Sequence, residues 1–191
     1  MNTIDAIYQR RSIRKFKAKK VPAELLEKML EAAIKAPSAM NRQPWRFVVL
    51  EGNKKNELVD ILLKRIARWK RWKAPVGGAA ASAELIRQAS AVILVFNAES
   101  RKNGFIKGFS TVLDVLYVQS IGGAIQTMLL AAQEFGLGTL WIGYVFLAAK
   151  DICRYVGKNE QLIAAVAVGY PNESPPPRPR KQLSEVTEWL N

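Results

Sequence analysis

The hydrophobic positions of the chain follow helical spacing in some stretches and strand-like spacing in others. Apolar residues that recur every three or four positions predict amphipathic helices. Such spacing occurs in residues 4–8, 25–34, 58–69 and 148–156. Short apolar runs rich in β-branched and aromatic residues predict strands. These runs are 45–50, 91–97, 139–144 and 162–169. The run at 91–97 (AVILVFN) is apolar up to its last position, which is typical of a strand covered on both faces.

A longer apolar stretch lies within a helix expected from about residue 111 to residue 135. Residues 115–133 carry no formal charge, so they have the length of a membrane span. They also contain polar side chains that are costly in hydrocarbon when they lack partners, namely Gln119, Ser120, Gln126, Thr127 and Gln133. We therefore expect a helix buried in a core or in a subunit interface, and no membrane partner.

The sequence shows no internal repeat and no linker that would split it. We expect one domain over residues 1–191, of class α+β, with about four strands and five or six helices. Five prolines between residues 171 and 179 predict an extended C-terminal tail, 171–191.

Charge and rare residues narrow the possible functions. The chain has 29 Lys and Arg against 16 Asp and Glu, and its formal charge of +13 favours anionic partners: nucleic acid, acidic membranes or phosphorylated small molecules. The sequence has no histidine, which excludes Ser-His-Asp and Cys-His catalysis and a His-ligated zinc. The one cysteine, Cys153, excludes a disulfide framework and gives no metal-ligand spacing. We expect no metal site and a cytoplasmic location, since no secretory signal is visible.

Two basic segments have the composition of phosphate-binding sites. The first is RRSIRKF at 10–16, in which five of seven residues are donors suited to phosphate oxygens, and the second is RPRK at 178–181. For the first segment the alternative is a solvated basic turn, and for the second an ordinary charged tail. Each segment alone leaves both interpretations open.

Two further segments have the composition of a ligand site. In PSAMNRQPW (37–45), small residues let a ligand approach the backbone, Asn41 and Gln43 offer polar groups, and Trp45 offers an aromatic wall. The alternative is a plain connection whose Trp fills the core. GLGTLWIG (136–143) leaves a helix and enters a strand, the reverse of a Rossmann turn, so a dinucleotide fold is rejected. Gly143 leaves room for a flat ring.

Taken together and in this order, these four segments resemble the nitroreductase family of flavoproteins, and the resemblance covers nearly the whole chain. It implies a three-layer α/β/α fold around a mostly antiparallel sheet of about four to five strands. It also implies a homodimer with FMN at the subunit interface. By resemblance, the FMN phosphate and ribityl chain contact Arg10, Arg11, Ser12, Arg14, Arg178 and Arg180. The loop residues Pro37, Ser38, Ala39 and Asn41 meet the flavin of the other subunit. The flavin ring is lined by Leu140, Trp141, Ile142 and Gly143.

The resemblance implies that hydride passes from NADH or NADPH through FMN to a small oxidised acceptor, such as a nitroaromatic, a quinone or a flavin, by a ping-pong mechanism. No catalytic acid or base is assigned, which agrees with the absence of histidine. A relative with different flavin chemistry, reductive dehalogenation or flavin breakdown, is the alternative. The variable stretch 66–108, expected as a lid, would decide between them.

The net charge is also consistent with a basic nucleic-acid-binding protein. We disfavour this function because it does not explain the segments at 37–45 and 136–143. The basic cluster from Lys64 to Lys73, interleaved with Trp69 and Trp72, has three interpretations: a solvated helix face, docking of a cofactor phosphate, or nucleic-acid contact.

Overall fold

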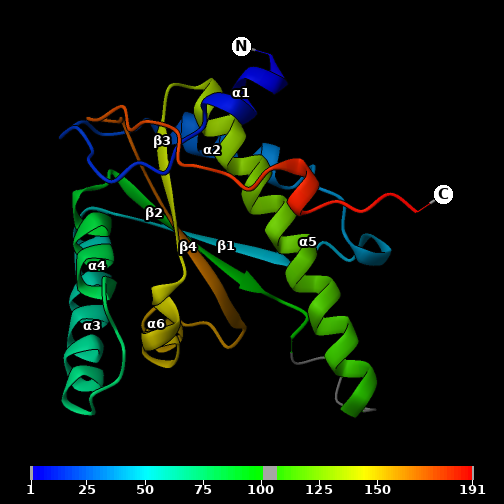
Figure 1. Ribbon diagram of the computed structural model, residues 1–191. Helices are drawn as coiled ribbons and strands as arrows, with labels where there is room; N and C mark the ends of the chain where they lie inside the picture. The colour runs from blue at the N-terminus through cyan, green and yellow to red at the C-terminus, as the bar shows by residue number, and fades with distance from the viewer. Residues whose placement is uncertain (1, 101–106, 191) are drawn as a thin grey trace.

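A four-stranded antiparallel sheet forms the centre of the molecule (Figure 1). The computed structural model describes residues 2–100 and 107–190, with the backbone alone for 107–111. The strands are β1 (Trp45–Glu51), β2 (Ala91–Asn97), β3 (Gly138–Ile142) and β4 (Gln161–Gly169). Their order across the sheet is β1-β2-β4-β3, and every neighbouring pair is antiparallel. The antiparallel sheet of the expected fold class is therefore confirmed, and β3 is an edge strand.

Helices cover both faces of the sheet because β2 and β4 are apolar at every position between their ends. In β2, Ala91, Ile93 and Val95 join one core cluster, and the residues between them join the other. The first cluster is covered by α2 (Ala23–Ala33) and α5 (Lys107–Glu134). The second is covered by α3 (Gly52–Arg71), α4 (Ala79–Gln88) and α6 (Ala149–Tyr155). The period of two along each strand thus produces three layers, as expected.

Helix α5 is only half embedded in this architecture. Ile121, Ile125 and Met128 are fully buried against the sheet and α2. Earlier in the helix, Val112 and Val115 are more than half exposed. The segment Val112–Glu134 is long and apolar enough to cross a membrane by length and composition, but 39% of its most apolar window is buried inside the molecule. The burial of its later turns fits a core helix, and the exposed side chains of Val112 and Val115 form an apolar surface earlier in the helix.

Segments from near the two ends of the chain lie beside β3. Helix α1 (Thr3–Gln9) is capped by Asn2, whose side chain accepts from the Asp5 amide at 2.9 Å; the residue before Thr3 thus provides the cap. The following segment forms a parallel bridge from Ser12 to Thr139 of β3. Its next residues pair with the chain that leaves β4: the Asn172 amide donates to the Lys15 carbonyl at 2.9 Å. Two distant parts of the sequence are thus held side by side (Figure 1).

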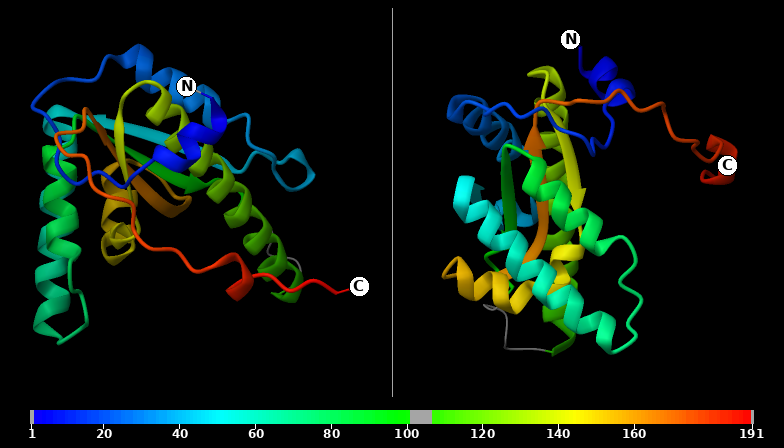
Figure 2. Two further views of the ribbon diagram at one scale, coloured as in Figure 1. Left: turned by 45° about the horizontal axis from the view of Figure 1, so that its top comes forward. Right: turned by 90° about the vertical axis from the view of Figure 1, so that its left-hand side faces the viewer.

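The tail beyond residue 172 leaves the body of the molecule. It contains no helix or strand before the short 3-10 turn η3 (Leu183–Glu185), and its end projects away from the helices in the right-hand view of Figure 2. Within the expected lid, 66–108, α4 packs on α3 and β2 lies inside the sheet, while 101–106 falls outside the described residues. A lid role for this stretch stays a prediction.

Candidate functional site

A cleft of about 500 Å³ lies between the N-terminal basic segment and the C-terminal tail. We call it the arginine cleft. Its lining residues are Ile7, Tyr8, Arg10, Arg11, Ser12, Arg14, Pro175, Pro176, Pro177, Arg178 and Arg180. All six residues expected to contact a phosphate therefore line one cavity, although the two groups lie at opposite ends of the sequence. That they hold FMN stays a prediction at this point.

The basic segment is fixed to the sheet by some of its own residues. Ile13 and Phe16 are buried, and the Ile13 amide donates to the Thr139 carbonyl at 2.9 Å. The carboxylate of Glu173 accepts from the backbone amides of Arg14 and Lys15, the latter at 3.1 Å, and so ties the tail to the segment. Glu173 was not predicted from the sequence. An isolated acid in a basic tail gives no sign that it binds backbone amides far away in the chain.

The cleft is strongly electropositive. It is lined by five arginines, and none of its lining residues, all in the described chain, is acidic. Burial, followed by the charges of Arg11 and Arg180, lowers the pKa of Arg10 from its ordinary value. The Arg11 guanidinium donates to the carbonyls of Tyr8 and Arg10 at 2.6 and 2.9 Å, and that of Arg180 donates to the carbonyl of Pro179 at 3.2 Å. Each guanidinium has five N–H donors, so donors remain for an anion.

Strand β3 presents two different faces near the cleft. Leu140 and Ile142 are buried in the core, so their side chains point away from the cleft and only their backbone is available to a ligand. Trp141 is 43% exposed and packs beside Gly122 of α5, where an added Cβ would lie 4.0 Å from the Trp ring. The Thr139 carbonyl faces the outer edge of the sheet, where it accepts from Ile13. Residues two apart in a strand direct their backbone groups to the same side, so the backbone groups of Trp141 face that edge too. Space is open around Gly143, since a Cβ at that position would meet no atom within 4 Å.

The segment 37–45 forms a short 3-10 turn, η1 (Ala39–Asn41), that is tied to α5. The Ala39 amide donates to the Ser120 hydroxyl at 3.1 Å, and this hydroxyl donates to the Leu116 carbonyl at 2.8 Å. Asn41 has a φ of 51°, and Trp45 is buried at the start of β1. The sequence pattern marks Ser120 only as a polar residue of the helix, so sequence reasoning missed its role as the anchor of this loop.

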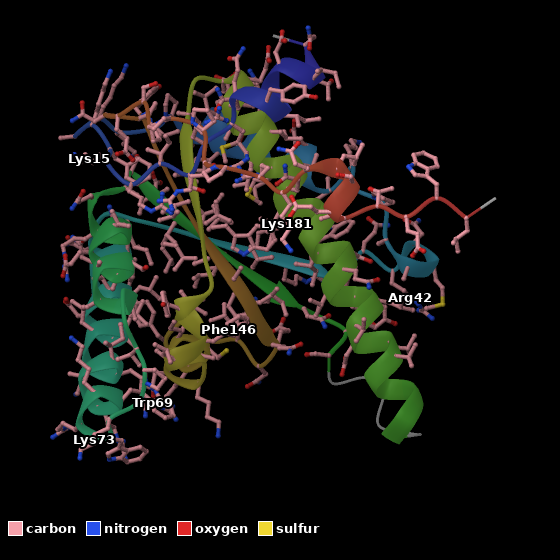
Figure 3. The ribbon with its side chains drawn as sticks, viewed as in Figure 1. Lys15, Arg42, Trp69, Lys73, Phe146 and Lys181 are labelled. Carbon is pink, nitrogen blue, oxygen red and sulfur yellow. The ribbon has the colours of Figure 1, made fainter. Side chains whose placement is uncertain are left out.

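The loop does not reach the arginine cleft of its own chain. Figure 3 shows Arg42 of the loop and Lys15 of the basic segment at opposite sides of the molecule, with α5 between them. None of the four expected loop residues lines the cleft. Their expected contact with a flavin held by a second subunit stays a prediction. The Trp45 side chain is buried in the core, as the alternative interpretation of this segment predicts.

In the part of the chain that the structure describes, acidic side chains do not gather into a metal-binding group. Within the described ranges, no group of three or more His, Cys, Asp or Glu side chains is placed to hold a metal ion. The site consists of an electropositive cleft beside an edge strand, with an exposed indole at residue 141.

Comparison with known proteins places these features in a family. The family model described as "Nitroreductase family" matches residues 7–170. A protein of Methanothermobacter thermautotrophicus, provisionally named NADH dehydrogenase/NAD(P)H nitroreductase, is 32% identical over 92% of this chain and 80% of its own length. An iodotyrosine deiodinase of Thermotoga neapolitana is 28% identical over 94% of each chain. The solved structure of a provisionally named nitroreductase of Desulfovibrio desulfuricans, in complex with FMN, is 29% identical with a TM-score of 0.77, over 100% of this chain and 98% of that one.

Proposed function

The chain belongs to the nitroreductase family of oxidoreductases, and we propose that it binds FMN in the arginine cleft and carries electrons from NAD(P)H to a small oxidised acceptor. The main support for the proposal is that one cavity is lined by arginines from both ends of the sequence. They are Arg10, Arg11, Arg14, Arg178 and Arg180. A family relative of known structure is in complex with FMN, and its similarity extends over the full length of this chain.

The residues present fit the phosphate end of FMN. A phosphomonoester carries close to two negative charges at neutral pH, and guanidinium forks bind its oxygens in pairs. The lining arginines have spare donors and no acidic competitor among the lining residues, so the cleft suits a dianion. We assign Arg10, Arg11, Ser12, Arg14, Arg178 and Arg180 to the phosphate and ribityl chain.

The open edge of β3 fits the flavin ring. The exposed Trp141 and the open space around Gly143 leave room for a flat ring against the backbone, whereas Leu140 and Ile142 contribute main-chain atoms only. When bound, FMN supplies the hydride and electron transfer chemistry. The chain's own residues bind and orient the cofactor, and we assign no side chain as acid or base. We propose a ping-pong exchange, in which NAD(P)H and the acceptor use the same place in turn.

We further propose that the working form is a homodimer. Exposed apolar side chains gather on α5 and on the tail, and a monomer seldom leaves so many in water. They include Val112, Val115, Leu116, Val118, Leu183, Val186, Trp189 and Leu190. Pairing two α5 helices would bring the 37–44 loop of one copy, held on α5 by Ser120, towards the cleft of the other. Replacing Val115 with Asp should convert the dimer to monomer in sedimentation velocity; a monomeric wild-type protein would contradict the assignment.

A second candidate chemistry is reductive dehalogenation. It is favoured by one finding, the similarity of 94% of the chain to an iodotyrosine deiodinase. Stopped-flow reoxidation separates the two: the reduced protein is mixed in turn with a nitroaromatic, a quinone, free flavin and an iodinated phenol. We expect one of the first three to reoxidise the protein fastest. Fastest reoxidation by the iodinated phenol, with release of iodide, would replace our proposal with the second candidate. We further propose a cytoplasmic location, since a chain with a single cysteine, Cys153, suits a reducing compartment.

A further inference from the structure

A second basic cavity of about 370 Å³ lies between α3 and α6, on the opposite sheet face from α5. Figure 2 shows the two helices crossing in its right-hand view. We call it the α3–α6 cavity. Its lining residues are Ile61, Lys64, Arg65, Arg68, Asp151, Arg154 and Tyr155. It shares none of them with the arginine cleft. The cavity is therefore a separate candidate binding site.

The four α3 residues that line this cavity lie on one face of the helix. Residues 61, 64, 65 and 68 fall at intervals of three and four, so they share one face of the helix. Asp151, Arg154 and Tyr155 have the same relation on α6. The basic cluster noted in the sequence thus divides: Lys64, Arg65 and Arg68 line the cavity, and Lys70, Arg71 and Lys73 do not.

The charges in the cavity do not balance. Asp151 is the single acid among its lining residues, against four cations. The Arg65 guanidinium binds Asp151 through two nitrogens, its Nε donating to Oδ2 at 2.7 Å, and Arg154 reaches Oδ1 at 3.4 Å. Within the described ranges, neither Lys64 nor Arg68 pairs with a carboxylate. Like charges at such short helical spacing repel each other, and an anion placed among them relieves that repulsion.

Aromatic side chains beside the cavity orient one of its cations, Arg68. Arg68 lies over the ring of Trp72, with its guanidinium carbon 5.3 Å from the ring centre. The indole of Trp69 meets that of Trp72 edge to face and donates to the Leu147 carbonyl at 3.0 Å. Tyr155 is fixed because its hydroxyl donates to Glu57 at 2.7 Å. A concave site with oriented guanidinium groups and an apolar wall from Ile61 differs from a solvated helix face.

We propose that the α3–α6 cavity binds a small phosphate-bearing molecule, with Lys64, Arg65, Arg68 and Arg154 as its anion ligands. Three uncompensated positive charges suit a multiply charged anion better than a monocarboxylate. A cavity of this size takes a phosphate ester or a pyrophosphate group, whereas a nucleic-acid surface requires an extended basic groove. The site is independent of the FMN cleft, and its occupation does not depend on the proposed redox activity.

Titration calorimetry tests the proposal, with the protein saturated in FMN so that the arginine cleft is filled. The probes are pyrophosphate and adenosine monophosphate at an ionic strength held constant with chloride. We expect saturable binding of one pyrophosphate per subunit. The double variant Lys64→Gln/Arg68→Gln should weaken it by at least about tenfold, because it removes two charge-assisted contacts. The matched control Lys70→Gln/Arg71→Gln removes the same charge from the same helix and should change the affinity by less than about twofold, since those side chains lie outside the cavity.

Three results would overturn the proposal. The first is an absence of saturable binding. The second is equal weakening in both double variants, which would indicate a general charge effect rather than a defined site. The third is loss of pyrophosphate binding in Arg10→Ala but not in Lys64→Gln/Arg68→Gln, which would assign the anion to the arginine cleft. The far-ultraviolet circular dichroism of each variant checks that α3 remains helical. The Trp72 indole signal in nitrogen-15 NMR should shift on pyrophosphate addition in the wild type, because Arg68 lies over that ring.

Discussion

Removing the guanidinium of Arg10 tests the phosphate assignment. In the protein without cofactor, Arg10 is partly buried beside the positive charges of Arg11 and Arg180, which lower its pKa. With FMN bound, the same group would face a phosphate dianion. Arg10→Ala therefore relieves repulsion in the first state and removes an attraction in the second. We expect the thermal midpoint of the cofactor-free protein to stay the same or rise slightly, while FMN affinity falls.

The expected loss follows from the strength of one contact. A hydrogen bond to a charged group contributes about 1.5–3 kcal/mol, which corresponds to a Kd for FMN raised about 10- to 150-fold. Arg10→Lys keeps the charge but loses the fork, so its effect should lie between those of the wild type and the alanine variant. The assay is quenching of FMN fluorescence on titration with cofactor-free protein.

The matched control is Lys15→Ala, which removes a positive charge from the same segment. The Lys15 side chain does not line the cleft, and its backbone amide, which binds Glu173, is preserved. This control should raise the Kd for FMN less than about threefold, as expected of a screened distant charge. An unchanged Kd in Arg10→Ala, or equal losses in Arg10→Ala and Lys15→Ala, would refute the reasoning.

Further predictions concern the edge strand, the loop and one tyrosine. Gly138→Ala should destabilise the fold by about 1–3 kcal/mol in urea unfolding, because its Cβ would lie 2.8 Å from Ile13 Cγ1; Gly143→Ala meets no atom within 4 Å, so it should leave unfolding unchanged but alter FMN affinity or the flavin spectrum. Ser120→Ala leaves the Ala39 amide without its acceptor and should cost about 1 kcal/mol of stability; equal stability would show that water replaces the hydroxyl. Burial, and then Glu57, raise the pKa of Tyr155 to about 12. Its stabilising effect should hold below about pH 10 and disappear as pH rises towards 12, so the absorbance difference between wild type and Tyr155→Phe should titrate near pH 12 rather than near pH 10.

Local hydrophobic patterns in the sequence predicted most of the helices and strands. The apolar run at 91–96 and the helical spacing at residues 25–34 both predicted the correct elements, because each reflects which positions are buried. The edge strand was placed less well: it ends at Ile142, before the expected Tyr144, where the 3-10 turn η2 (Tyr144–Ala148) begins. Short edge strands have one bonded neighbour, so tertiary pairing rather than residue preference sets their ends.

The candidate site was predictable in its charges but not in its connections. The arginines of both segments were visible as donors, whereas the resemblance, not the sequence pattern, brought Arg178 and Arg180 to the first segment. The contacts that hold them there depend on Glu173 and on backbone pairing between Lys15 and Asn172, which no local pattern encodes. Likewise, the division of the basic cluster on α3 into cavity-lining and outward residues required the position of α6.

The flavin content and reactivity of the purified protein test most directly whether this chain is an FMN oxidoreductase. The protein is saturated with FMN, freed of excess cofactor, and its flavin absorbance is measured per subunit before and after anaerobic addition of NADH or NADPH. We predict about one FMN per subunit, a site count expected from one arginine cleft per chain, with loss of the oxidised flavin spectrum on adding NAD(P)H and its return on adding a nitroaromatic or quinone. A colourless protein that retains no added FMN, or bound FMN that neither nucleotide reduces, would contradict this assignment.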